Sequence, residues 1–395
     1  MTDTTTADSP LSGLRVAFLT ESLPSPKTHG SEIVSSCFVE SLLALGCRLT
    51  VVGHQRVGPY YDRIASWELP IGRIRIETRY ASLGEKLRWI GGALLHDLPI
   101  TSAKYRNRHY LDAVRRLIGE TDLVVVDHTQ MYWCEPLIRG RAHAVVIHNH
   151  ESRIYYDLAR AQRNPLKRLI LDHESRQLHR LERHIDQGSA AIWGLADKDL
   201  QDFRHPVQRF DPYSFLVPLP AKPRTALYQL GMLGMWTWKP NQEALVWFID
   251  EVLPLLPPEV VVAVAGNGVP SWIKPTKNLR LIGFTDSVSG FFAQCQAIAI
   301  PALHDVGIQV KSIDALALGI PVIGTQMAFR GIPQLPAHGQ AAMDAADFAR
   351  LVCATLRSPT DLQPVGADSW NGARKALFSA QLERSVRALL NHQPE

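Results

Sequence analysis

The sequence lacks several features that would place a protein in a class at once. Its five cysteines are scattered and odd in number, with no C-x-x-C pair and no His at zinc-ligand spacing, so we interpret them as reduced core residues. No apolar run approaches the roughly 18 to 20 residues that span a bilayer. The start, MTDTTTADSP, is polar and acidic and does not look like a secretory signal. We therefore expect a cytoplasmic protein.

An excess of charge of one sign is also missing. The 42 Lys and Arg against 38 Asp and Glu give a net charge of +4, which is too slight for nucleic-acid binding by bulk charge, so we predict no nucleic-acid partner. The 46% of hydrophobic and 20% of charged residues are typical of a packed globular chain. At roughly 100 to 200 residues per domain, the 395 residues predict two domains, or at most three.

Short β-rich runs alternate with amphipathic helical stretches from residue 14 onward. Residues 14–19 and 49–52 have strand character, and 31–45 have one apolar helical face, which together make one β-loop-α-β unit. Buried strands are predicted again at 123–126 and 144–147. This alternation is typical of a parallel sheet covered by helices.

The second half of the chain repeats this pattern after a long Arg-rich helical stretch and a cluster of prolines. Because proline ends helices and central strands, we place the domain boundary in that cluster. The predicted domains are a disordered tail (1–12), an N-terminal Rossmann-like domain (13–220), a C-terminal domain (221–371) and a helical tail (372–395). The second domain is predicted to contain strands at 227–233, 260–265, 279–284, 297–303 and 322–323, and helices at 241–256 and 308–318.

Residues 301–322 are the most informative stretch: a strand, a polar loop ending at Gly307, a helix that we expect to begin at that glycine, and another strand. The positive end of such a helix is a ready site for a phosphate. Lys311 and Asp314 are three residues apart and share a face, where the cation suits a diphosphate and the carboxylate suits ribose hydroxyls. From spacing alone, an ordinary surface ion pair is an equally good interpretation.

Five stretches in the second half, in this order, resemble the nucleotide-binding domain of glycosyltransferase family 4, the group 1 retaining glycosyltransferases. They are 231–241 (GMLGMWTWKPN), 247–254 (WFIDEVLP), 264–266 (VAG), 283–286 (GFTD) and 307–322 (GIQVKSIDALALGIPV). The resemblance implies the GT-B fold: two doubly wound, Rossmann-like α/β domains that face each other across a cleft, with a C-terminal helix crossing back.

The resemblance also implies roles for individual residues. Lys239 and Lys311 would neutralise the donor diphosphate. The family's two glutamates, which have seven residues between them, fall here on Val306 and Asp314, which leaves Asp305 as the candidate replacement for the first. The residues implied to contact the nucleotide sugar are Gly30, Gly266, Phe284, Gly307, Ile308 and Asp314.

The first half keeps less of the family pattern. His29-Gly30 takes the place of a glycine-rich loop, and Gly30 can adopt a positive φ and expose backbone N–H groups at a helix start. A plain turn before a helix is the competing interpretation. His128 follows the strand at 123–126, where the family often keeps a histidine near the reacting sugar; a buried structural histidine is the alternative.

No metal and no cofactor is predicted, with the nucleotide sugar acting as substrate. His148 and His150 crowd the end of one strand, but a zinc or iron site needs a further convergent ligand. Asp197 and Asp199 form a lone acidic pair on a predicted helix.

Two windows are locally basic: residues 86–116 and 153–184 are net positive by five and by four. The first is also amphipathic. Peripheral contact with an anionic membrane face or a lipid-linked acceptor is one interpretation, and a helix packed on its own sheet with a solvated outer side is the other.

The resemblance implies an enzyme that moves a hexose from a UDP- or GDP-linked donor to a glycan or lipid-linked acceptor, with retention of configuration, in cell-envelope or exopolysaccharide synthesis. A catalytically inactive relative that binds nucleotides or regulates remains the alternative. A Rossmann oxidoreductase is disfavoured because no G-x-G-x-x-G follows the first strand.

Overall fold

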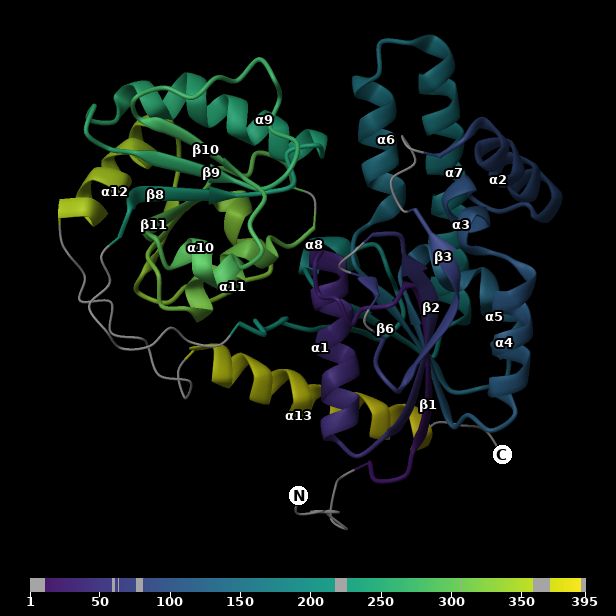
Figure 1. Ribbon diagram of the computed structural model, residues 1–395. Helices are drawn as coiled ribbons and strands as arrows, with labels where there is room; N and C mark the ends of the chain where they lie inside the picture. Colours follow the sequence, from purple (N-terminus) through teal and green to yellow (C-terminus); the bar gives the residue numbers. More distant parts are fainter. Residues whose placement is uncertain are drawn as a thin grey trace. The chain divides into compact units, whose positions relative to one another are not determined.

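The protein is described by a computed structural model that covers residues 11–58, 61–62, 64–75, 81–216, 226–305, 307–357 and 370–391 (Figure 1). Contacts divide the chain into two units, one made of the residues up to Phe210 and from Leu377 onward, the other of Asp211–Ala376. The predicted boundary at 220/221, the first ten residues of the predicted tail and Val306 lie outside the described residues.

The first unit is built on a seven-stranded sheet in the order β3-β2-β1-β4-β5-β6-β7, and all its neighbouring strands pair in parallel. The central strands β4 and β5 are buried along their whole length, as expected for a parallel sheet covered on both faces. The strands are β1 (Arg15–Ser22), β2 (Arg48–Arg56), β3 (Glu68–Ile74), β4 (Leu123–Asp127), β5 (His143–Ile147), β6 (Ala191–Gly194) and β7 (Val207–Arg209).

Helices cover this sheet and extend beyond it. The helices are α1 (Gly30–Ala44), α2 (Leu83–His96), α3 (Ile100–Tyr105), α4 (Arg108–Ile118), α5 (Glu135–Ile138), α6 (Glu151–Ala161), α7 (Pro165–Gly188) and α8 (Asp197–Leu200), with a 3₁₀ turn, η3, at Thr129–Cys134. The last helix, α13 (Trp370–Asn391), begins in the second unit and ends in the first, where Phe378 packs edge-on against Phe38 of α1.

The second unit repeats the plan with a six-stranded parallel sheet in the order β10-β9-β8-β11-β12-β13. Its strands are β8 (Tyr228–Leu233), β9 (Val262–Ala265), β10 (Leu279–Gly283), β11 (Cys295–Ile300), β12 (Val322–Thr325) and β13 (Gly339–Ala342). Its helices are α9 (Lys239–Trp247), α10 (Val288–Phe292), α11 (Val310–Ala317) and α12 (Ala345–Arg357), with a π turn η4 (Phe248–Val252) and 3₁₀ turns η5 (Leu253–Leu255) and η6 (Gln326–Phe329).

The predicted architecture of two doubly wound parallel sheets is confirmed, and the predicted strands and helices lie where expected to within a few residues. Four strands were missed: the seven-residue β3 and the short strands β6, β7 and β13. Two details were wrong. The helix expected at Gly307 begins at Val310, and the helix expected over 241–256 loses its regular α-helical form after Trp247. Pro254, inside the 3₁₀ turn, cannot continue an α-helix.

In both sheets the strand order reverses beside the first strand of the unit, between β1 and β4 and between β8 and β11. In sheets of this kind ligands bind at such a switch point, outside the carboxyl ends of the strands. The topology therefore marks one candidate edge in each unit. None of the helices in the described ranges is long and apolar enough to cross a bilayer.

Candidate functional site

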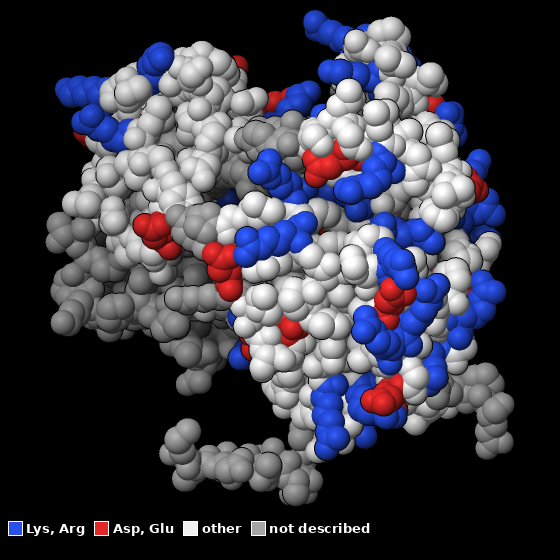
Figure 2. Space-filling model, turned by 45° about the vertical axis from the view of Figure 1, so that its right-hand side comes forward, with Lys and Arg blue, Asp and Glu red and all other residues white. Residues whose placement is uncertain are grey.

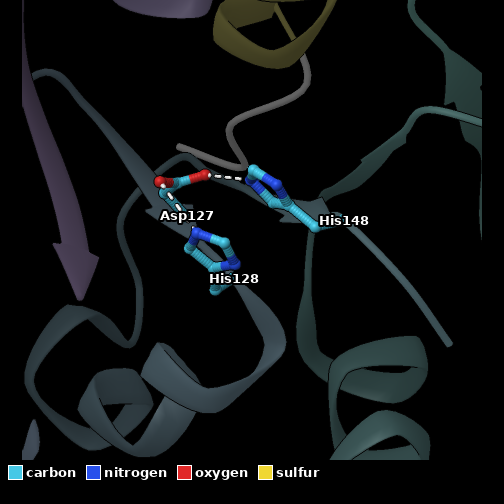
Figure 3. Close-up of side chains that lie close together, drawn as sticks. All are labelled: Asp127, His128 and His148. Atoms are coloured by element: carbon cyan, nitrogen blue, oxygen red, sulfur yellow. Dashed lines mark hydrogen bonds and ion pairs between the residues drawn. The ribbon is translucent and has the colours of Figure 1, made fainter. Parts of the chain in front are cut away.

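Asp127 is the centre of the switch-point edge in the first unit. It ends β4, is fully buried, and accepts hydrogen bonds at Oδ2 from Thr20 Oγ1 (2.8 Å) on β1 and Ser35 Oγ (2.7 Å) on α1. Its Oδ1 lies 2.7 Å from Nε2 of His148, which follows β5 (Figure 3). One buried carboxylate thus joins segments that are far apart in the sequence.

His128 completes this cluster. Its Nε2 is 3.7 Å from Asp127 Oδ2, and its ring stacks on that of His148 with 3.7 Å between the ring centroids. The backbone at His128 has a φ of 75°, a conformation that non-glycine residues rarely adopt, and its amide donates to the carbonyl of Val146. Such strain persists only where surrounding contacts hold it, and it is found often at functional sites.

The cluster shifts the pKa of each of its members. Burial opposes ionisation of Asp127, but the two histidines and the hydroxyl of Ser35 outweigh it and lower its pKa to about 2. Burial and the neighbouring His128 lower the pKa of His148. Burial also acts against protonation of His128, yet Asp127 with Glu21 and Glu151 raises its pKa. Because two stacked imidazoles repel each other when both are charged, the pair holds one added proton most readily, on His128.

The same three side chains offer a carboxylate oxygen and two imidazole nitrogens within 4.8 Å of one another. This is a donor set that Zn²⁺ can use. The hydrogen bonds and the ion pair among Asp127, His128 and His148 account for these positions without an ion. The absence of a metal stays a prediction.

The loop before α1 is built differently from what the sequence suggested. Gly30 opens the helix as its first residue, and the positive φ of the loop lies at Lys27 (51°). The buried carboxylate of Glu32 accepts from the amides of Thr28 (2.9 Å) and His29 (3.3 Å) and pairs with Arg56. Two of the loop amides are therefore already engaged within the unit.

In the second unit, Lys311 lies at the switch-point edge between β8 and β11. It is in the first turn of α11, where its Nζ is 3.4 Å from Oδ1 of Asn241 on α9 and 6.0 Å from the centre of the Trp236 ring. Burial lowers the pKa of this amine to about 8. Among the residues that the structure describes, no carboxylate forms an ion pair with it.

Asp314, one turn further along α11, is bound elsewhere. Its Oδ1 accepts a short hydrogen bond of 2.5 Å from Ser214 Oγ, and burial raises its pKa to about 6. Lys311 and Asp314 share a helix face, as predicted, but each is held by a neutral side chain from another segment. The interpretation as an ordinary surface ion pair is therefore wrong.

Lys239 opens α9 and is largely exposed, with 66% of its side chain accessible. Its Nζ lies 3.4 Å from Glu243 Oε1, one turn along the helix, and Glu243 Oε2 lies 2.5 Å from Nε2 of His304. A small hollow at this edge is lined by Trp238, Pro240, Asn241, Ala302, Leu303, His304 and Gln309. These residues come from the segments that follow β8 and β11, so the hollow lies at the switch point of the second sheet.

The remaining predicted residues line the same carboxyl edge. Asp305 Oδ1 is 2.9 Å from Arg330 Nε, so this carboxylate already has a cationic partner. Gly307 has a φ of 62°, and Ile308 follows it, half-buried. Phe284 follows β10 and is 47% exposed.

Gly266, directly after β9, is the most constrained of these glycines. Its φ is 110°, and a Cβ at this position would lie within 2 Å of the carbonyl oxygen of Gly234. No other residue fits this close approach between the ends of β8 and β9.

Sequence reasoning missed Asp127 and Ser35 in the first unit and Ser214 in the second, and it grouped His148 with His150, whereas the structure groups His148 with Asp127 and His128. A signal for two of them was present: Asp127 and His148 end two consecutive predicted strands, and adjacent parallel strands finish at the same sheet edge. Ser35 and Ser214 had no local signal, because their partners lie 92 and 100 residues away.

These two edges have different chemical capacities. The first holds a buried imidazole beside a carboxylate, which can donate a hydrogen bond to a hydroxyl or take up a proton. The second holds a partly desolvated ammonium (Lys311), an exposed ammonium (Lys239) and a buried carboxylate (Asp314) on the segments that follow β8 and β11, which suits an anionic group attached to hydroxyls.

Comparisons with known proteins agree with this chemistry in the second unit. Residues 228–358 match the family model described as Glycosyl transferases group 1. The match contains Lys239, Lys311 and Asp314, and it confirms the predicted kind of domain, a glycosyltransferase domain. None of the curated proteins compared with the chain matches it.

Solved structures share the fold of this chain over both of its units. The Anabaena protein Alr3699/HepE, solved in complex with UDP-glucose, is 12% identical and aligns over 95% of this chain and 100% of its own with a TM-score of 0.60. The same protein in complex with UDP and glucose is 12% identical and aligns over 96% of this chain and 99% of its own, with a TM-score of 0.59. The calicheamicin glycosyltransferase CalG4 is 15% identical over 97% of this chain and 100% of its own, with a TM-score of 0.50. The expected GT-B fold is confirmed.

Proposed function

We propose that this protein transfers a hexose from a nucleoside-diphosphate sugar, UDP- or GDP-linked, to a hydroxyl of a glycan or lipid-linked acceptor. The observation that carries the proposal is the placement of Lys311 and Asp314 at the switch-point edge of a sheet that matches a group 1 glycosyltransferase domain. The complexes of Alr3699/HepE with UDP and UDP-glucose, the structures of highest TM-score named above, support a nucleotide sugar as donor.

In this proposal the second unit binds the donor. The ammonium of Lys311, partly desolvated and held in place by Asn241 and Trp236, interacts with the diphosphate more strongly than a solvated amine could. Lys239 adds a second, exposed cation. The carboxylate of Asp314 accepts from the ribose hydroxyls, and Gly307 lets a phosphate approach the backbone.

The first unit binds the acceptor, with His128 donating a hydrogen bond to a hydroxyl of the reacting sugars. Asp127 holds the imidazole in its strained position and favours its protonated form. We propose retention of configuration, as in family 4: the acceptor attacks on the face that the leaving diphosphate departs from, and that phosphate takes the acceptor proton. Charge develops on the leaving group in this step, so preorganised cations stabilise the transition state.

We further propose that the reaction takes place in the cytoplasm and serves cell-envelope or exopolysaccharide synthesis.

The test of the proposed reaction is a thermal-shift screen of UDP, GDP, UMP and GMP, followed by donor hydrolysis and transfer assays with UDP- and GDP-hexoses. We expect one of the two diphosphates to raise the melting temperature of the protein more than its monophosphate does. The sugar linked to that diphosphate should be turned over, and NMR of the product should show an unchanged anomeric configuration.

The second candidate function is an inactive relative that binds nucleotides. It is favoured by the ion pair of Asp305 with Arg330, which engages the carboxylate expected to replace the first family glutamate. Nucleotide binding without hydrolysis or transfer for any donor would select this candidate and exclude the enzyme.

A further inference from the structure

The first unit carries a concentration of exposed apolar side chains on three helices. Ten of the 23 large hydrophobic residues that are exposed in the described ranges lie on α2, α6 and α7. Nine of them, which we call the apolar surface, are aliphatic: Leu83, Leu87, Ile90, Leu94 and Leu95 on α2, Leu158 on α6, and Leu166, Leu169 and Ile170 on α7. Patches of this kind mark interaction sites in proteins.

On α2 the exposed residues form a stripe. Leu83, Leu87, Ile90 and Leu94 are spaced by four, three and four residues, which places them on one helix face, and Leu94 is 75% exposed. A different face, with Trp89 and Ala93, is buried in the unit. The helix therefore has a second apolar face that its own fold does not use.

Helix α2 packs on α3, and the ends of both are hydrogen-bonded to α7. The Asp97 carboxylate, at the end of α2, accepts a hydrogen bond of 3.0 Å from Gln177 of α7, and Glu174 of α7 accepts from the amides of Ile100 (2.8 Å) and Thr101 (2.9 Å) on α3. Helices α6 and α7 pack as a hairpin that stands out from the sheet (Figure 1). The apolar surface thus lies on helices that are joined to one another within the first unit.

Cations accompany the apolar side chains. Between residues 153 and 170, Arg153, Arg160, Arg163, Lys167 and Arg168 are all exposed, against the single carboxylate of Asp157, and Arg88 is exposed on α2. The side of the first unit where α2 is drawn in Figure 1 comes forward in Figure 2, and blue side chains outnumber red ones there.

We infer that this apolar surface and its cations bind the first unit to the headgroup region of a bilayer that contains anionic lipids. The leucines would enter the boundary between headgroups and acyl chains, and the cations would pair with lipid phosphates. A second copy of the chain is the poorer occupant, because a two-fold interface would set the same cations against each other. This inference does not depend on glycosyl transfer.

The experiment is co-sedimentation of the full-length protein with vesicles of phosphatidylcholine alone and of phosphatidylcholine with about 30% phosphatidylglycerol. Binding to the anionic vesicles is expected, at least tenfold tighter than to the neutral ones, and it is expected to weaken as salt is raised. Equal binding to both vesicles, or none to either, would overturn the inference.

Two pairs of variants locate the surface. Leu94→Asp with Leu95→Asp is expected to weaken vesicle binding more than tenfold, since both side chains are more than 70% exposed and the fold does not need them. Met343→Asp with Leu255→Asp, exposed in the second unit, is the matched control and should leave binding unchanged. An equal effect of the two pairs would place the contact elsewhere.

The charge contribution has its own pair. Lys167→Gln with Arg168→Gln removes two cations, and each cation strengthens binding to an anionic surface by about tenfold or less. This pair of substitutions is therefore expected to weaken binding to the anionic vesicles. Lys274→Gln with Lys277→Gln, exposed in the second unit, is the control. A dimer in solution that dissociates in Leu94→Asp with Leu95→Asp would show that a second copy covers the surface instead, and would overturn the inference. Loss of vesicle binding with unchanged donor hydrolysis separates it from the proposed function.

Discussion

At the sheet edge of the first unit a buried carboxylate and two histidines bind one another, whereas Lys311 and Asp314 at the edge of the second unit are each held by a neutral partner. Asp127 gathers His148, Thr20 and Ser35 around one carboxylate. In the second unit, Lys311 meets an amide and an indole, and Asp314 meets a hydroxyl.

This difference separates stability from binding. A buried carboxylate that satisfies several donors stabilises the fold around it, and its removal leaves those donors unpaired. A half-buried cation and a buried carboxylate that lie next to neutral groups have given up solvation without a matching charge. Such groups gain most when a ligand supplies the opposite charge or the missing hydrogen bonds, so we expect the first edge to limit stability and the second to limit donor binding.

The largest effect on stability is expected for Asp127→Ala. It removes the acceptor of His148, Thr20 and Ser35 from a buried site, so the free energy of unfolding of the first unit should fall by about 3–5 kcal/mol. Chemical unfolding at neutral pH measures the loss.

Asp122→Ala is the matched control. Asp122 pairs with Arg15 at 2.6 Å in the same unit, but both side chains are substantially exposed, so a loss below about 1 kcal/mol is expected. Similar losses for the two variants would mean that the Asp127 cluster does not stabilise the unit more than a surface ion pair does.

Lys311→Met tests the opposite behaviour in the second unit. Loss of a preorganised cation should raise the transition-state free energy by roughly 2–4 kcal/mol, about 30-fold to 1,000-fold in kcat/KM for the donor. The free energy of unfolding should not fall, because the replacement removes a half-buried charge that has no ionic partner in the described part of the chain. Transfer kinetics and chemical unfolding of the same variant measure both quantities.

Lys274→Met, at an exposed position of the same unit, is the control and should keep wild-type kinetics.

The wild type should also show a characteristic pH dependence of nucleotide binding. Because burial lowers the pKa of Lys311 to about 8, affinity for a nucleoside diphosphate should fall as the pH rises through that value, and less steeply in Lys311→Met. Wild-type kcat/KM in Lys311→Met would contradict its assignment to the donor.

The strand pattern of the chain could predict both sheets but only part of either edge. Buried runs such as 123–126 and 144–147 are continuous apolar segments, and the structure confirms them as β4 and β5. Asp127 and His148 directly follow these runs, so their proximity was open to inference. Short or edge strands such as β7 have too few apolar residues to be distinguished from a loop.

What the sequence could not show is the partner of each charged group. Helical spacing correctly puts Lys311 and Asp314 on one face, but Asn241 and Ser214, which decide the surroundings of the two, come from segments 70 and 100 residues away. The same holds for Asp305, whose ion pair with Arg330 arises from the close approach of a later turn. Tertiary contacts, not local pattern, set these electrostatics.

Asp314 offers a pH test of the same comparison. Burial raises its folded pKa to about 6 from an ordinary value of about 4, so its contribution to stability is fully present below pH 4 and is lost as the pH rises through 6. Between about pH 4.5 and 7.5 the loss amounts to about 2 kcal/mol. Asp314→Asn should lack this loss, measured as the difference in unfolding free energy between the two pH values. The same pH dependence in both proteins would show that the carboxyl titrates normally.

The smallest effect on kcat/KM is expected for Lys239→Ala, which compares the exposed cation of the second unit with Lys311. The ammonium of Lys239 is 66% exposed and pairs with Glu243, so water and a carboxylate already screen the charge that would reach a diphosphate. We expect Lys239→Ala to lower kcat/KM for the donor by less than about fivefold, in the range of an exposed ion pair. Glu243→Gln, which removes the competing carboxylate, should raise the contribution of Lys239, so that Lys239→Ala costs more in that background. A Lys239→Ala defect as large as that of Lys311→Met would show that the exposed cation, and not the buried one, neutralises the donor.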